Sequence, residues 1–109
     1  MTKFIVALLA FATTAAIAQG PFTINIPTSG VRTCEPIRIT WNGGTPPFYL
    51  VVRTPIGVIN LGEVRRRSIV WTVNQAPGTR IGIDISDSEG QLHQSGDFTP
   101  SASTSTACL

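Results

Sequence analysis

The sequence has 109 residues, with eight basic and six acidic side chains and a formal net charge of +2. A chain of this length suits a single folded domain. Its nearly balanced charge excludes attachment to nucleic acid or another polyanion by bulk electrostatics, so no nucleic-acid partner is expected.

Residues 1–18 have the pattern of a secretory signal peptide. Lys3 supplies the positive charge, an apolar run extends from Phe4 to Ala12, and Ala16-Ile17-Ala18 is a small-x-small site that predicts cleavage before Gln19. A membrane anchor is the alternative, but the apolar run is shorter than the roughly 20 residues that span a bilayer. We therefore expect a protein secreted to the extracellular space or cell wall, without a stable membrane anchor.

The rest of the chain is expected to form one domain over residues 19–99, followed by a tail over residues 100–109. The tail is composed almost entirely of Ser, Thr, Ala and Pro, which is typical of a flexible and often O-glycosylated stretch. In a secreted chain, Cys34 and Cys108 predict one disulfide that draws the tail back to the domain; free thiols or an intermolecular bridge are the alternatives. The long loop that this disulfide would close predicts a stabilisation of the folded state by about 4 kcal/mol.

Apolar and polar residues alternate in most of the segments that follow, as in Ile37-Arg38-Ile39-Thr40-Trp41. This period of two predicts half-buried strands. The turn residues from Asn42 to Pro47 join that strand to the next one as two antiparallel strands. The predicted strands are 22–26, 37–41, 48–53, 58–61, 69–73, 81–86 and 92–98.

The strand at 48–53 has apolar residues on both faces, so we expect it to lie centrally, whereas 58–61 is expected at an edge. Gly96 weakens the last strand. Seven strands without any helical period beyond the signal peptide predict an all-β protein, a two-sheet sandwich of immunoglobulin or fibronectin type, with a barrel as the alternative. Trp41 and Trp71 are in phase with Ile39 and Ile69, which favours the core over an exposed sugar-stacking role.

No catalytic constellation can be assembled from these residues. His93 is the single histidine, and its alternation with Leu92 and Gln94 predicts a position on the outer face of the last strand. No pair of carboxylates lies in an apolar setting that would suit a glycosidase. We therefore expect no enzyme activity, no metal and no cofactor.

Asp84, Asp87 and Glu89 form an acidic group around one turn. Their oxygen atoms suit calcium, but their spacing matches no calcium loop, and solvated turn acids are the favoured interpretation.

Two surfaces are candidates for binding. The first comprises Asn42, Phe48 and Tyr49, because rigid loops at the ends of sandwiches often carry recognition. The second is the run Arg65, Arg66 and Arg67, which suits an anionic glycan, a membrane headgroup or a processing protease, with a solvated loop as the simpler interpretation.

The order of several short motifs resembles that of small fungal secreted proteins with a Ser/Thr-rich, often GPI-anchored architecture. The motifs run from Cys34-Glu-Pro-Ile-Arg-Ile-Thr-Trp41-Asn-Gly-Gly-Thr-Pro-Pro-Phe-Tyr49 through Ile69-Val-Trp71 and Ala76-Pro-Gly-Thr79 to Asp87-Ser-Glu-Gly90. The folded part of those proteins is similar to the N-terminal domain of the yeast cell-wall synthesis and knob-homologue family. The resemblance implies an immunoglobulin-like sandwich, a link to β-1,6-glucan assembly and no catalytic residues.

Longer members of that family continue into a Ser/Thr-rich stalk and an anchor signal, whereas this chain stops at Leu109, which favours a freely secreted form. The leading functional prediction is a non-enzymatic, cell-wall-associated module that binds β-glucan weakly. The alternative is a secreted interaction protein or effector that binds an extracellular protein through a sheet edge or the Arg65–Arg67 loop.

Overall fold

The computed structural model describes residues 21–27 and 29–109. The signal peptide predicted at residues 1–18 lies outside this range. Within the described ranges the regular structure consists of strands, and no helix there is long and apolar enough to cross a membrane.

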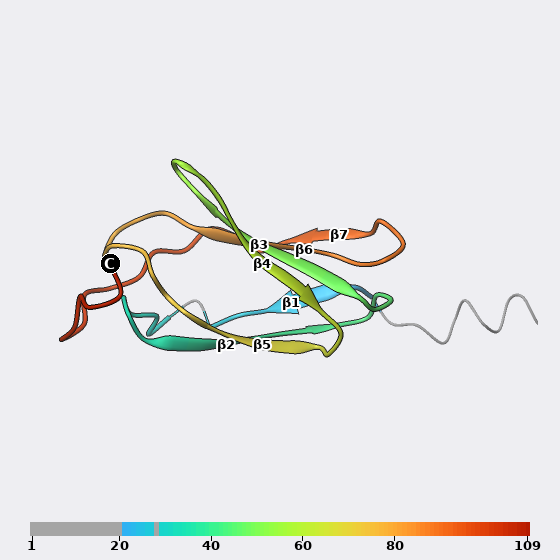
Figure 1. Cartoon of the computed structure of the whole chain (residues 1–109), viewed down its shortest axis with the longest axis horizontal. Coiled ribbons are helices and arrows are strands. Elements are labelled where there is room, and N and C mark those ends of the chain that lie inside the picture. The colour runs from blue at the N-terminus through green and yellow to red at the C-terminus, as the bar shows by residue number, and fades with distance from the viewer. Residues whose placement is uncertain (1–20, 28) are drawn as a thin grey trace, which may run out of the picture.

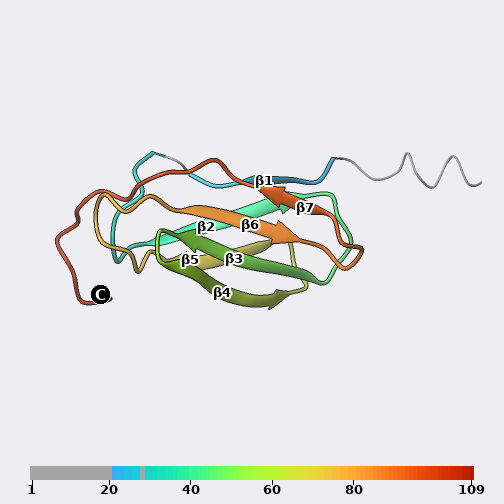
Figure 2. The same cartoon turned by 90° about the horizontal axis from the view of Figure 1, so that it is seen from above.

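Seven strands form two antiparallel sheets that face each other as the layers of a sandwich (Figure 1). One sheet has the order β1-β2-β5 and the other β4-β3-β6-β7, which Figure 2 shows from above. The predicted all-β, immunoglobulin/fibronectin-like sandwich is therefore confirmed. The strands are β1 (Thr23–Asn25), β2 (Pro36–Asn42), β3 (Phe48–Thr54), β4 (Gly57–Val64), β5 (Ser68–Thr72), β6 (Gly82–Ser86) and β7 (Leu92–Gln94).

The two strands predicted on either side of the Asn42–Pro47 link do not pair with each other. Strand β2 pairs with β1 and β5, whereas β3 pairs with β4 and β6, so the link carries the chain from one sheet to the other. Gly43 and Gly44 turn the chain with φ values of 75° and 73°, which glycine adopts without steric cost. The apolar faces of β2 and β3 are thus buried against each other across the sandwich.

The core is formed by the inward residues of both sheets. Trp41 and Phe48 are almost fully buried, and their rings meet edge to face with centroids 5.4 Å apart. Trp71 is 7% exposed, so the predicted core position of both tryptophans is confirmed. As predicted, β3 lies inside its sheet and β4 at its edge.

The last predicted strand is shorter than expected, and its phase is wrong. Strand β7 ends at Gln94, and Phe98 forms only an isolated bridge to Ile81. His93 lies opposite the buried Ile85 and therefore points inward, where its ring is 6.5 Å from Phe22. Leu92 is the outward residue and is 61% exposed. The small residues after β7 leave too little apolar sequence to fix the phase by alternation.

The beginning of the Ser/Thr-rich tail is hydrogen-bonded to the domain. Ser101 donates its N–H to the carbonyl of Val31 and accepts the N–H of Thr33, both at 2.9 Å. Ser103 Oγ donates to the carbonyl of Thr33 at 2.6 Å. The predicted Cys34–Cys108 disulfide is present, and it holds the far end of the tail beside Val73.

Removing the disulfide should lower the free energy of unfolding by about 2–5 kcal/mol, because the bridge closes a long loop in the unfolded chain. The Cys34→Ala/Cys108→Ala double variant tests this by urea denaturation, with the reduced parent protein as a control that removes the same bridge. Equal unfolding midpoints for the oxidised parent and the double variant would contradict the expectation.

Candidate functional site

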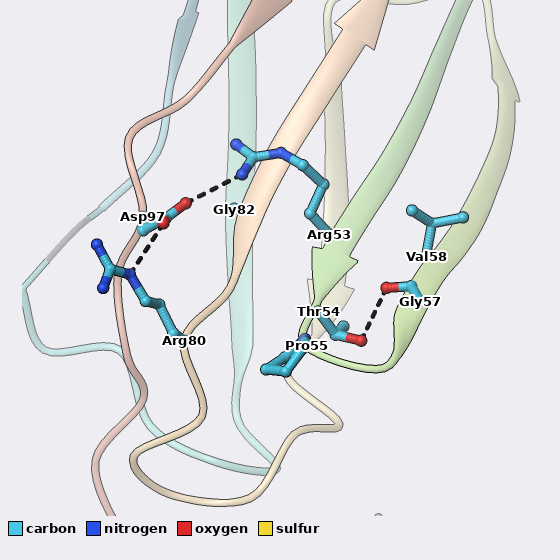
Figure 3. Close-up of a pocket in the computed structure, with 8 residues that line it drawn as sticks. All are labelled: Arg53, Thr54, Pro55, Gly57, Val58, Arg80, Gly82 and Asp97. Carbon is cyan, nitrogen blue, oxygen red and sulfur yellow. Dashed lines mark hydrogen bonds and ion pairs between the residues drawn. The ribbon is translucent and has the colours of Figure 1, made fainter.

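A hollow of about 460 Å³ lies on the four-stranded sheet where β3 turns into β4 (Figure 3). Charged side chains stand on one side of it, and the hairpin residues that follow β3 stand on the other. The lining residues are Arg53, Thr54, Pro55, Gly57, Val58, Arg80, Gly82 and Asp97.

Arg53 is the fixed point of the charged side. Its Nε donates to Asp84 Oδ1 at 2.7 Å, Nη1 to Asp97 Oδ1 at 3.0 Å and Nη2 to the carbonyl of Ser95 at 3.0 Å. The hydrogen bond to Asp84 is the largest cause of a raised pKa for Arg53, ahead of the opposing effect of burial. Three acceptors from two segments, β6 and the stretch after β7, therefore hold one guanidinium in a single orientation.

Gly82 makes room for this guanidinium. Arg53 and Gly82 are partners in the β3–β6 register, and a Cβ atom on Gly82 would overlap Arg53 Nη2 and lie 2.7 Å from Cζ. Because Gly82 has no side chain, the Arg53 side chain can lie across β6.

Asp97 joins Arg53 to Arg80. Its second oxygen, Oδ2, accepts Arg80 Nε at 2.9 Å, and the hydrogen bonds from Arg53 and then Arg80 lower the pKa of Asp97. The Arg80 side chain is 76% exposed, and its Nη1 and Nη2 have no hydrogen-bond partner among the described residues. The hollow therefore presents free donors beside an ionised acceptor.

This arrangement suits a neutral ligand with neighbouring hydroxyl groups. One hydroxyl can donate to a remaining lone pair of Asp97 while the next accepts from Arg80. Pro55 and Val58 offer an apolar surface opposite these groups. The two arginines and the two aspartates balance in charge, so the site holds no excess charge for an ion, and the lowered pKa of Asp97 is the opposite of what a general acid needs.

Phe48 does not belong to any binding surface, contrary to the prediction. Its side chain is 0% exposed, packs against Trp41 and has the guanidinium of Arg67 5.3 Å from the centre of its ring. Phe48 is in phase with Leu50 and Val52, and this alternation already indicated an inward position.

The loop that precedes Phe48 is packed against its neighbours. Arg67 Nη2 donates to the carbonyl of Gly44 at 2.9 Å, and the N–H of Thr45 donates to Asp87 Oδ2 at 2.9 Å. A Cβ atom on Gly44 would lie 2.9 Å from the Phe22 and Phe48 rings. Asn42 is exposed at the end of β2, so the structure does not bring it together with Phe48 as one surface.

Tyr49 remains on the surface. It is 43% exposed on the outer face of β3, and its hydroxyl lies 3.4 Å from Glu63 Oε1.

The three arginines form the short connection between β4 and β5. Arg65 pairs with Glu63 at 3.3 Å, Arg66 is exposed, and Arg67 binds the glycine loop. They lie at the Phe48 end of β3, whereas the hollow lies at its Thr54 end. Sequence reasoning missed the hollow, because its charged residues are far apart in the chain.

Asp87 is buried, so its interpretation as a solvated turn acid is wrong. Its carboxylate accepts the N–H groups of Glu89 at 3.1 Å and Gln91 at 2.8 Å, and that of Thr45. Asp84 pairs with Arg53 and does not join Asp87 in one acidic group. Over residues 21–27 and 29–109, no three His, Cys, Asp or Glu side chains are placed to hold a metal ion. An aspartate at the start of Asp-Ser-Glu-Gly is typical of an Asx turn, and this signal was available.

Replacing Asp87 should make stability less dependent on acid pH. Burial raises the pKa of this carboxyl, but the hydrogen bonds from Thr45, Gln91 and Glu89 together bring it below its ordinary value of 3.8. Its stabilisation is therefore complete above that value and is lost as the pH falls through the lower folded-state pKa.

Asp87→Ala should lower the free energy of unfolding at neutral pH by about 2–3 kcal/mol. Asp87→Asn retains an acceptor oxygen and should show a shallower loss of stability below about pH 4 than the parent, measured by denaturation at several pH values. If the free energy of unfolding of Asp87→Asn falls as steeply below about pH 4 as that of the parent, Asp87 is not the group whose protonation destabilises the fold.

Gly82→Ala should cost up to about 1 kcal/mol of stability, because the added methyl pushes the flexible, partly exposed Arg53 guanidinium away from its three acceptors. Gly96→Ala is the matched control, since a Cβ there meets nothing within 4 Å. The cost of Gly82→Ala should shrink in an Arg53→Ala background, and an equal cost in both backgrounds would show that the arginine is not responsible.

Comparisons of the chain with protein-family models, with curated proteins and with solved structures found no match. The resemblance to the fungal cell-wall family therefore stays a prediction from the sequence motifs. The hollow and the outer face of its sheet are the features from which a function can be argued.

Proposed function

We propose that this chain is a secreted, non-enzymatic module of the fungal cell wall that holds one sugar unit of a wall polysaccharide in the hollow. The observation that carries the proposal is the free end of the Arg80 guanidinium beside the Asp97 carboxylate, opposite Pro55 and Val58. Donor, acceptor and apolar surface are the three elements that recognise a pyranose ring. The resemblance to proteins of glucan assembly is consistent with such a ligand.

The rigidity of the charged side supports this proposal. Arg53 is held by partners on β6 and in the segment after β7, and Asp97 is held by Arg53 and Arg80. A ligand therefore meets groups that are already oriented, which reduces the entropic cost of binding. The loop before Phe48 and the side chain of Arg67 are engaged in packing, so they are weaker candidates.

A second candidate is a secreted protein-interaction factor that uses the β3–β4 hairpin. Ile56 is 97% exposed and Val58 67% exposed, and the hairpin rises above the other strands in Figure 1. Exposed apolar side chains on a projecting element are typical of protein-docking sites. This surface replaces the Arg65–Arg67 loop as the preferred site for a protein partner.

Retention on insoluble β-1,3-glucan, β-1,6-glucan, chitin and cellulose tests the leading proposal. The oxidised protein without residues 1–18 should be retained on one of these polymers, in high salt as well as low, because the site holds no excess charge. Arg80→Ala should weaken retention roughly tenfold, which corresponds to the loss of a hydrogen bond from a charged group.

Arg38→Ala is the control, since it removes the same charge from an exposed position on the opposite sheet. Equal weakening by both variants would point to non-specific electrostatics and contradict the site. Absence from every pellet would contradict the proposal and favour the second candidate, for which a captured partner should be lost on Ile56→Glu.

A further inference from the structure

The outer face of β3 continues from the hollow as an ordered strip. Tyr49, Val51 and Arg53 point outward, while Leu50 and Val52 between them are buried. We infer that the ligand is an extended oligosaccharide chain that lies along β3, from the hollow at Arg53 to the ring of Tyr49. This inference rests on the proposed function and specifies the length and the path of the ligand.

The length of the strip argues for a chain and not for a single sugar. Tyr49 and Arg53 are four residues apart on one strand, a separation of roughly 13 Å at the usual rise of a β-strand. One pyranose ring cannot contact both residues. A ligand that fills the hollow and also stacks on Tyr49 must therefore span several linked sugar units.

The strand register places polar side chains on both sides of Tyr49 and Val51, whereas Arg53 lies opposite Val58 and Gly82. Tyr49 lies opposite Glu63 on β4 and Ser86 on β6. Two residues further along β3, the next outward residue is Val51. Val51 lies opposite Asn60 and Asp84 on the same two strands. The apolar side chains of Tyr49 and Val51, with polar groups on both sides, match the apolar face and the peripheral hydroxyls of a sugar chain.

The Tyr49 end is suited to stacking. The Tyr49 hydroxyl lies 3.4 Å from Glu63 Oε1 on one side, and Ser86 is too small to cover the ring from the other side. Leu92, the partner of Ser86 on β7, extends the apolar surface and is 61% exposed. The charges on the strip are paired, Arg53 with Asp84 and Glu63 with Arg65, so a neutral chain fits better than a polyanion.

A length series of soluble oligosaccharides tests the inference. The probes are β-1,3- and β-1,6-linked gluco-oligosaccharides from the monosaccharide upward, with dissociation constants measured by calorimetry. Affinity should rise with chain length until the strip is spanned and then level off. Tyr49→Ala should weaken the binding of the long oligosaccharides about tenfold and leave the shortest ones unchanged, whereas Arg80→Ala should weaken all lengths.

Two control variants separate stacking from other effects. Tyr49→Phe keeps the ring and should retain most of the affinity for long chains. Val70→Ala removes an exposed apolar side chain from β5 in the other sheet and should change nothing. Long-chain binding that depends on Arg80 but not on Tyr49 would overturn the inference and leave the hollow as the whole site. Absence of binding at every length would overturn the proposed function as well.

Discussion

The packing of β2 against β3 across the sandwich is the constraint on which the other features depend. Trp41 and Phe48 meet at the end of the two strands nearest the Asn42–Pro47 link, and the inward apolar residues of both strands are removed from water. Because side chains alternate along a strand, the burial of Phe48, Leu50 and Val52 forces their neighbours outward. The same alternation that builds the core therefore also builds the outer strip and sets Arg53 at the edge of the hollow.

The outer face is organised by paired charges. Arg53 connects three segments, and Gly82 is the residue whose missing side chain allows it to do so. Exposed ion pairs stabilise a fold only weakly. The ion pairs around Arg53 therefore contribute more to the positions of these side chains than to the stability of the fold. Position is what a binding site requires. The hollow thus uses the rigidity of the sheet for its charged side and the projecting hairpin for its apolar side.

The strands, the two-layer fold, the core tryptophans and the disulfide could be predicted from the sequence, because each depends on local alternation or on the cysteine count. The binding role predicted for Phe48 overlooked its local alternation with Leu50 and Val52, whereas other errors arose where tertiary contacts decide. His93 points inward because β7 pairs with β6 in the register that sets it opposite the buried Ile85, and Asp87 is buried because its carboxylate closes a turn and accepts an N–H group from a distant loop. The hollow could not be predicted at all. Arg53 and Asp97 are 44 residues apart, and nothing in either local sequence indicates that they meet.

The most direct test of an oligosaccharide site along β3 is to follow amide and arginine-side-chain chemical shifts by NMR during titration with a gluco-oligosaccharide. We expect shifts along the outer face of β3 from Tyr49 to Arg53, at Asp97 and at Arg80 Nε, with little change on β2 and β5. Shifts confined to the Arg65–Arg67 connection, or to the loop before Phe48, would contradict it.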